Sequence, residues 1–331
     1  MLKNDIFNLK SVNENVFRAI ALELFHFQSE IISVCRQFIN NLGIKPESIK
    51  QIEDIPFLPV EFFKTNKIYC SDIPPKVVFT SSSTTNTGQS KHYIADVYLY
   101  EKSIFETFSY FYGNPADYCF LCLLPSYLER KGSSLIYMAE YLIKKSKYRQ
   151  SNFYLNNYSD LYNQFIENEK QLIPTIFLGV SFALLNFAQQ FTMKLKNTIV
   201  METGGMKGHH QEITRQELHS ILCEKLGVNK IHSEYGMTEL LSQAFSQGDG
   251  IFKTPPWMKI IIYDIHNPLK TSVSNAGGIN IIDLANQWSC AFIQTDDIGM
   301  KISNSLFKVT GRKDNSEIRG CNLLVEISNF N

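Results

Sequence analysis

The chain has 331 residues, of which 44% are apolar, enough for the core of one large domain or of a domain with a small appendage. Lys and Arg together number 32, as do Asp and Glu, so the formal net charge is 0. A neutral chain without a basic run is not expected to bind nucleic acid by neutralising phosphates, and it predicts no basic face for a membrane surface.

Features of a targeted or membrane-bound chain are missing from the sequence. The N-terminus has no charged segment followed by an apolar one, and the apolar stretch 180–188 falls short of the ~20 residues that span a bilayer. We therefore expect a cytoplasmic protein whose seven cysteines are reduced thiols. Cys119 and Cys122 form a C-x-x-C inside an apolar run, which favours a buried strand over a metal or redox site.

Helix and strand signals alternate along most of the chain. An apolar stripe predicts a helix over 16–41 with Gly43 as a stop, and two prolines make 54–59 an extended connector. The expected strands are then 76–80, 118–124, 175–178, 198–201 and 230–233, and the expected helices are 95–112, 134–145, 181–191 and 214–225. This alternation predicts an α/β fold with a mostly parallel sheet covered by helices.

The pattern changes after Gly250. Strands are expected at 258–263, 278–284, 290–294 and 305–309, with no helices between them. We therefore expect an α/β core over residues 1–250 and a smaller β-rich subdomain over residues 251–331.

The segment that follows the strand 76–80 is rich in hydroxyl groups, which six of the seven residues 81–87 carry. Such a loop before a helix can aim N–H groups and hydroxyls at phosphate oxygens, with Lys91 as a mobile point charge. A polar surface loop is an equal alternative from these residues alone, and the Walker A pattern is absent. The candidate phosphate-binding residues are Ser81, Ser82, Ser83, Thr84, Thr85 and Gly88.

A second polar segment, 233–239, follows a strand. Gly236 permits a sharp bend, Tyr235 offers a ring that can stack on a purine, and Glu239 offers a carboxylate of the kind that meets hydrated magnesium. The alternative is a strand-ending turn capped by charges.

Two more charged positions follow near the end of the chain. Asp297 ends an apolar strand, where an acid can accept both hydroxyls of a ribose, and Arg312 follows Gly311 near a turn. A solvated acid and a solvated arginine are the alternatives.

In this order the four segments resemble the nucleotide-binding signatures of the acyl-adenylate-forming enzymes. The Y-G-x-T-E signature of that superfamily is matched at Tyr235, Gly236, Thr238 and Glu239. The phosphate loop is similar to S-G-T-T-G-x-x-K, although Ser83 stands where glycine is usual and Asn86-Thr87 looks like an insertion.

The remaining signatures are matched by fewer residues. Asp297 matches the acid of T-G-D, with Asp296 in place of the glycine, and Arg312 matches the arginine of G-R-x-D. By the same resemblance, Gly204 and Gly205 form a glycine-rich turn against which adenine lies.

The resemblance implies the large N-terminal domain of these enzymes, with ATP and Mg²⁺, and a carboxylic acid activated as acyl-AMP. It makes Glu239 the residue that meets magnesium, Lys91 a group that neutralises the departing pyrophosphate, and Arg312 a contact to the nucleotide. Larger members continue into a mobile C-terminal domain, whereas about 19 residues follow Arg312 here, so we expect that lid to be absent.

The short chain resembles the LuxE family of acyl-protein synthetases, also through residues 124–130 with Ser133 and Ser134, and through residues 317–323. In that family a cysteine near the C-terminus carries the acyl group as a thioester, and Cys321 is the matching position. Gly320 gives that segment freedom and Arg319 favours the thiolate. The alternative is a cysteine packed in a last strand.

The expected function is therefore activation of a carboxylic acid, of the fatty class, and its transfer through Cys321 to a partner. The resemblance suggests an acyl reductase, an acyltransferase or an acyl carrier protein as that partner. Two alternatives stay open: a ligase that uses the thiol of coenzyme A or of a carrier, and an inactive scaffold that binds an acyl group or a nucleotide.

Overall fold

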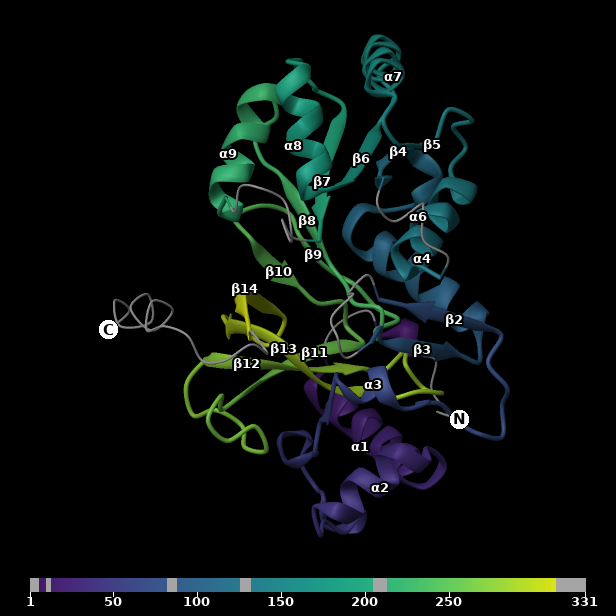
Figure 1. Cartoon of the computed structure of the whole chain (residues 1–331), viewed down its shortest axis with the longest axis vertical. Helices are drawn as coiled ribbons and strands as arrows, with labels where there is room; N and C mark the ends of the chain where they lie inside the picture. Colours follow the sequence, from purple (N-terminus) through teal and green to yellow (C-terminus); the bar gives the residue numbers. More distant parts are fainter. Residues whose placement is uncertain (1–5, 10–12, 82–87, 126–131, 205–212, 314–331) are drawn as a thin grey trace.

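The computed structural model describes residues 6–9, 13–81, 88–125, 132–204 and 213–313 (Figure 1). Its α-helices are α1 (Glu14–Ile31), α2 (Ser33–Asn41), α3 (Phe62–Thr65), α4 (Val97–Tyr112), α6 (Ser134–Lys145), α7 (Tyr158–Lys170), α8 (Ser181–Gln190) and α9 (Arg215–Leu226). Its strands are β1 (Leu58–Pro59), β2 (Val77–Thr80), β3 (Lys91–Ile94), β4 (Cys119–Leu123), β5 (Asn152–Tyr154), β6 (Thr175–Val180), β7 (Thr198–Thr203), β8 (His232–Tyr235), β9 (Ala244–Ser246), β10 (Ile251–Lys253), β11 (Met258–Tyr263), β12 (Ala276–Asp283), β13 (Phe292–Lys301) and β14 (Leu306–Arg312).

One large sheet organises the molecule, in the order β11-β12-β13-β14-β10-β9-β8-β7-β6-β4-β5, with β1 beside β13. The strands from β8 to β5 are parallel, which confirms the predicted α/β fold. β4, which contains Cys119 and Cys122, and β6 are buried along their whole length. Figure 1 shows why: α8 and α9 lie on one side of this part of the sheet, and α4 and α6 lie on the other.

The other half of the sheet is antiparallel, and its strands β10–β14 follow one another without a helix, as expected after Gly250. Helices α1 and α2 lie beneath these strands in Figure 1. Phe25 of α1 meets Phe292 of β13 with ring centroids 5.8 Å apart, and Gln28 Nε2 donates to Asn286 O at 2.7 Å. The division of the chain into residues 1–250 and 251–331 stays a prediction.

Local capping explains where several helices begin and end. Thr214 and Glu217 form a reciprocal capping box at the start of α9, and Asp96 caps α4 through the backbone N–H of Leu99. Gly227 ends α9 at φ 65°, where a Cβ atom would lie 2.8 Å from Met193 O, so only glycine fits there.

The predicted single helix over 16–41 is wrong, because it divides into α1 and α2 at Ile32. This residue takes an extended conformation, with φ −100° and ψ 105°, and buries its side chain completely. The hydroxyl-rich segment was expected to lead into a helix, but the next element among the described residues is β3, which pairs with β2. In the described part of the chain, no helix is long and apolar enough to cross a membrane.

Candidate functional site

Strands β8, β13 and β14 bring three of the predicted site residues together. Tyr235 donates its phenolic hydrogen to Asp297 Oδ2 at 2.7 Å. Arg312 lies opposite Asp297 in the β13–β14 pairing, and its Nε atom is 4.0 Å from Asp297 Oδ1. The Asp297 carboxylate therefore lies between a neutral donor and a guanidinium.

The strand boundaries around these residues differ from the prediction. β13 does not end at Asp297 but continues to Lys301, because β14 pairs with its second half. Arg312 likewise lies in β14 instead of in a turn, and Tyr235 is the last residue of β8. The three residues are thus fixed by strand pairing, which gives their side chains a defined direction.

The ring of Tyr235 crosses the strands that separate β8 from β13. It packs against Phe252 of β10 and Phe307 of β14, with ring centroids 5.7 and 5.5 Å away. Burial and the charge of Asp297 hold the pKa of the Tyr235 phenol well above its usual range. The phenol therefore keeps its proton and acts as a donor to Asp297 at neutral pH.

Glu239 lies in the segment that follows β8, and its side chain is 4% exposed. Burial raises the pKa of this carboxyl group, while a hydrogen bond with Ser90 and the charge of Arg312 act in the opposite direction. Glu239 therefore belongs to the same electrostatic environment as Asp297 and Arg312. A cation placed beside it would offset the cost of its burial.

The backbone around Glu239 is held by buried side chains that the sequence did not single out. His92 Nδ1 lies 2.8 Å from Thr238 O, and Asn286 Nδ2 donates to Glu239 O at 2.9 Å. Asp283 Oδ2 accepts from the N–H groups of Leu241 and Ser242 at 2.8 and 2.9 Å. The available signal was polar residues within or directly after apolar strands, the same signal that identified Asp297.

The base of the hydroxyl-rich segment is closed by backbone and side-chain bonds. Ser81 N donates to Ser90 O at 3.0 Å, and Ser90 N donates to Ser81 Oγ at 3.0 Å. Gly88 has φ +88°, a conformation that L-residues with a side chain rarely adopt.

Lys91 is placed less close to the other site residues than the sequence suggested. Its side chain is exposed, whereas its neighbours Ser90 and His92 are buried and contact the segment around Glu239. Because successive side chains alternate across a strand, Lys91 points to the opposite face of β3. Its approach to a phosphate stays a prediction.

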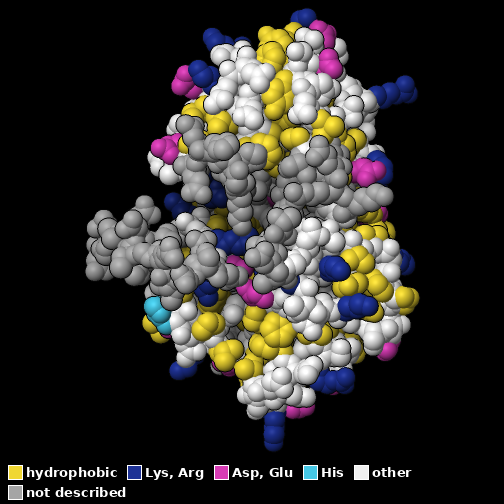
Figure 2. Space-filling view, viewed as in Figure 1, with side chains coloured by type: hydrophobic (Ala, Val, Ile, Leu, Met, Phe, Trp, Pro, Cys, Tyr) yellow, Lys and Arg dark blue, Asp and Glu magenta, His cyan; other side chains and the backbone are white. Residues whose placement is uncertain are grey.

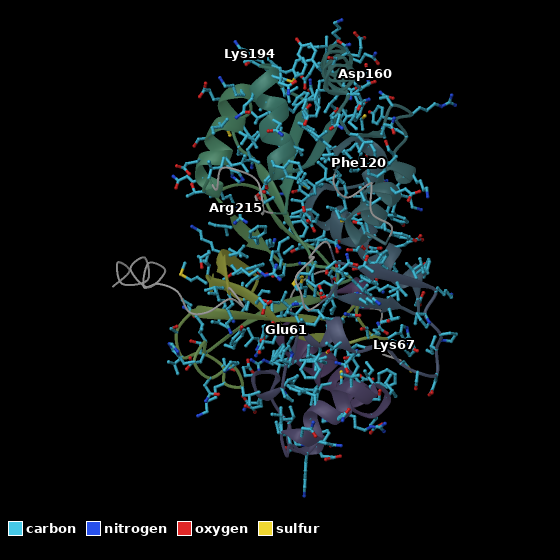
Figure 3. The ribbon with its side chains drawn as sticks, viewed as in Figure 1. Glu61, Lys67, Phe120, Asp160, Lys194 and Arg215 are labelled. Atoms are coloured by element: carbon cyan, nitrogen blue, oxygen red, sulfur yellow. The ribbon has the colours of Figure 1, made fainter. Side chains whose placement is uncertain are left out.

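A second carboxylate, Asp296, lies next to Asp297 and is 9% exposed. Burial and a hydrogen bond with the Glu61 carboxyl group raise the pKa of Asp296 to about 6, against the charges of Arg312 and Lys64. Arg312 Nη2 lies 3.7 Å from Asp296 Oδ2. Figure 3 shows Glu61 near strands β11 and β13. Figure 2 shows acidic and basic side chains side by side at the middle of the face that is turned to the viewer.

The end of β7 is fixed by the buried carboxylate of Glu202. Ser181 Oγ donates to Glu202 Oε2 at 2.8 Å and lies 3.1 Å from Gly204 O, while Arg215 Nε donates to Glu202 Oε1 at 3.1 Å. Figure 3 shows Arg215 where α9 approaches β10. Gly204 has φ +71°, consistent with the expected glycine turn.

Gly236 does not use the left-handed backbone region, because its φ is not positive. A Cβ atom at this position would lie 2.4 Å from Glu234 Oε1. Glycine is therefore needed to make room for the Glu234 carboxyl group. Burial raises the pKa of that group to about 7, with a smaller contribution from the charge of Glu202 and an opposing hydrogen bond from Thr203.

Six of the predicted site residues lie outside the described part of the chain. They are Ser82, Ser83, Thr84, Thr85, Gly205 and Cys321.

Comparisons with known proteins bear on the fold. No family model matches the chain, and no curated protein matches it. Solved structures do match: a 2-hydroxyisobutyryl-CoA ligase with a bound acyl-adenylate superposes with a TM-score of 0.68 at 12% identity, covering 95% of this chain and 72% of that one.

Two further matches are more partial. ATP-bound MatB from Rhodopseudomonas palustris superposes with a TM-score of 0.53 at 15% identity over 71% of this chain, which spans about half of that protein (47%). McyG A-PCP, complexed with phenylalanyl-adenylate, gives a TM-score of 0.53 at 15% identity over 87% of this chain and 55% of that one. The chain therefore has the α/β fold of the large N-terminal domain of the acyl-adenylate-forming enzymes.

Proposed function

We propose that this protein activates a carboxylic acid with ATP. A carboxylate oxygen of the acid attacks the α-phosphorus, the bond to the β-phosphate oxygen breaks, and acyl-AMP and pyrophosphate form. The observation that carries this proposal is the cluster of Tyr235, Asp297 and Arg312 beside the buried Glu239. Three separate motifs of one nucleotide signature supply these residues, and the similar solved structures hold ATP or acyl-adenylates.

Asp297 and Arg312 are the residues that would hold the nucleoside. The Asp297 carboxylate is fixed by Tyr235 on one side and faces Arg312 on the other, so its orientation is set before a ribose arrives. A pre-oriented carboxylate can accept both ribose hydroxyls without paying the entropy of becoming ordered. Arg312 supplies a permanent positive charge for a phosphate oxygen.

Glu239 is the residue that would hold a magnesium ion. Among the described residues, no group of three His, Cys, Asp or Glu side chains is arranged to hold a metal without help from a substrate. Such a complete set of protein ligands is not required for Mg²⁺, which is often bound by one or two carboxylates together with waters and substrate phosphates. Bound there, it would neutralise the charge that develops on the pyrophosphate as it leaves.

The second half of the proposed reaction is transfer of the acyl group to a thiol. The thiolate attacks the carbonyl carbon of acyl-AMP, and AMP leaves. We propose Cys321 as this thiol, a fatty acid as the substrate, and an acyl reductase, acyltransferase or acyl carrier protein as the final acceptor. This part rests on the LuxE-like sequence segments, since Cys321 lies outside the described residues.

Acid-dependent exchange of labelled pyrophosphate into ATP tests the first half directly. The protein should exchange only when a carboxylic acid is present, and it should release AMP. Formation of ADP and an acyl phosphate would overturn the proposal, because that chemistry attacks the γ-phosphate. Absence of exchange with fatty, aromatic and small acids alike would favour a binding scaffold.

A further inference from the structure

The segment after β8 is fixed by two hydrogen bonds to consecutive backbone carbonyls. His92 Nδ1 lies 2.8 Å from Thr238 O, and Asn286 Nδ2 donates to Glu239 O at 2.9 Å. Both side chains are buried, with 0% and 1% of their surface exposed. They come from β3 and from the turn after β12, so two distant elements meet at Glu239.

The direction of both hydrogen bonds is determined by their partners. A carbonyl oxygen only accepts, so His92 Nδ1 carries a proton. Burial lowers the pKa of His92 to about 4, against the hydrogen bonds with Thr238 O and with Asn286, whose Oδ1 lies 3.2 Å from His92 Nε2. Asn286 Nδ2 also donates to Cys290 O at 2.8 Å, which fixes the orientation of its amide group.

The same strand also reaches the carboxyl group of Glu239. Ser90 directly precedes β3, contacts the Glu239 side chain, and lies on the same face as His92 because the two are separated by one residue. The backbone before Glu239 and its carboxyl group are therefore held by two residues, His92 of β3 and Ser90 directly before it, that lie on the same face. Asn286 holds the carbonyl of Glu239 itself, and its Oδ1 lies 3.2 Å from His92 Nε2, so the two supporting side chains also contact each other.

We propose that His92 and Asn286 are positioning residues, which orient the Glu239 carboxylate toward the magnesium ion of a bound Mg²⁺–ATP. The inference rests on the proposed function. Residues that orient a metal ligand typically change metal affinity by roughly 10- to 100-fold when they are removed. A role in stability alone would leave the magnesium requirement unchanged.

Four variants separate the two roles. His92→Phe keeps an aromatic ring but loses the N–H that donates to Thr238 O. His92→Asn keeps an N–H close to the position of Nδ1. Asn286→Leu removes the donor to Glu239 O. Asn168→Leu is the matched control, since Asn168 is equally buried (1% exposed) and donates to Thr175 Oγ1 at 3.0 Å between α7 and β6.

Two magnesium requirements are measured. One is the magnesium concentration that gives half-maximal ATP binding, which calorimetry monitors, and the other is the concentration that gives half-maximal pyrophosphate exchange. His92→Phe and Asn286→Leu should raise both magnesium requirements about 10- to 100-fold, and those of His92→Asn should stay within about threefold of the wild type. Asn168→Leu should lower the melting temperature without changing the magnesium requirement. Equal magnesium requirements in the wild type and folded His92→Phe would overturn the inference.

The two readouts distinguish failure of the inference from failure of the proposed function. A wild type that binds Mg²⁺–ATP but does not exchange pyrophosphate overturns the proposed function, and calorimetry still ranks the variants. A wild type whose ATP binding is independent of magnesium overturns the inference, whether or not it exchanges pyrophosphate.

Discussion

Tyr235 and Asp297 are 62 residues apart in the chain, yet the phenol of the first donates to the carboxylate of the second at 2.7 Å. Three strands, β9, β10 and β14, separate their own strands in the sheet. The bond therefore exists only in the folded protein, and it ties the Y-G-x-T-E segment to the expected ribose acid. It also makes the orientation of Asp297 depend on Tyr235.

Replacing Tyr235 with Phe should loosen Asp297 and weaken ATP binding. A hydrogen bond to a charged group contributes about 1.5–3 kcal/mol, so we expect the KM for ATP to rise roughly 10-fold or more, with a smaller change in kcat. Tyr118→Phe is the control, since its hydroxyl donates to Tyr112 O at 2.8 Å in a different part of the fold. An unchanged KM for ATP in Tyr235→Phe would remove the role assigned to this bond.

Removing the carboxylate itself should have a larger effect. Asp297→Ala deletes the acceptor that would meet the ribose and removes one of the two carboxylates beside Arg312, which keeps Asp296 at 3.7 Å. The ATP requirement of pyrophosphate exchange should rise roughly 100-fold, corresponding to a few kcal/mol. Steady-state exchange over a wide range of ATP concentration, with circular dichroism to check folding, measures this. Wild-type kinetics in a folded variant would mean that the nucleotide lies elsewhere.

Glu239→Gln should act on the magnesium-dependent step. The amide keeps the shape of the side chain but removes the negative charge that would face the cation, so the rate of exchange should fall roughly 100-fold or more at saturating ATP. The fall should be smaller at high magnesium concentration. Equal loss at every magnesium concentration would argue that Glu239 acts by another route.

The sequence predicted that strands lie near 230–233, 290–294 and 305–309, where β8, β13 and β14 are found, because each of these segments contains apolar residues that the fold buries. It did not predict how far β13 extends, since Asp296, Asp297 and Gly299 look unlike a strand until β14 pairs with them. Helix α7 was missed for a related reason: its sequence is polar, and only Leu161, Phe165 and Asn168 are buried.

The partners of the supporting residues could not have been found from local patterns. His92 contacts a carbonyl 146 residues further along the chain, and Asn286 contacts one 47 residues before it. Nothing near either residue in the sequence signals these partners, because the contacts arise from the sheet order. Motif matching identified the groups that we propose to face a nucleotide, whereas the groups that hold them in place needed the fold.

The pH dependence of stability should reveal the buried carboxyl group of Glu234. Its pKa is about 7 in the folded protein and near 4.5 when unfolded, so between these values the folded state binds the extra proton. Stability contributed by this group is therefore lost as pH rises through that window. Glu234→Gln cannot ionise and keeps an acceptor for Thr203, so it should be more stable than the wild type at pH 8, by an amount on the order of 3 kcal/mol.

Urea unfolding at pH 4 and pH 8 measures this difference, which should be small at pH 4. Glu224→Gln is the control, since that side chain is 75% exposed and should show no such change between the two pH values. A Glu234→Gln variant with the same stability difference at both pH values would show that Glu234 ionises normally in the folded protein.

The role proposed for Cys321 has a covalent consequence. Incubation with ATP and a labelled fatty acid should leave label on the protein, and neutral hydroxylamine should release it, because a thioester is cleaved under conditions that leave oxygen esters intact. Cys321→Ser should lose the hydroxylamine-labile label but keep pyrophosphate exchange, since the thiol acts only after acyl-AMP has formed. Acylation should also protect the cysteine from alkylating reagents.

Cys223→Ser is a suitable control, since this thiol is the one described cysteine that is not buried. Normal labelling of Cys321→Ser, or label that appears only on added coenzyme A, would assign the thiol to an external acceptor and make the protein a soluble-thiol ligase instead.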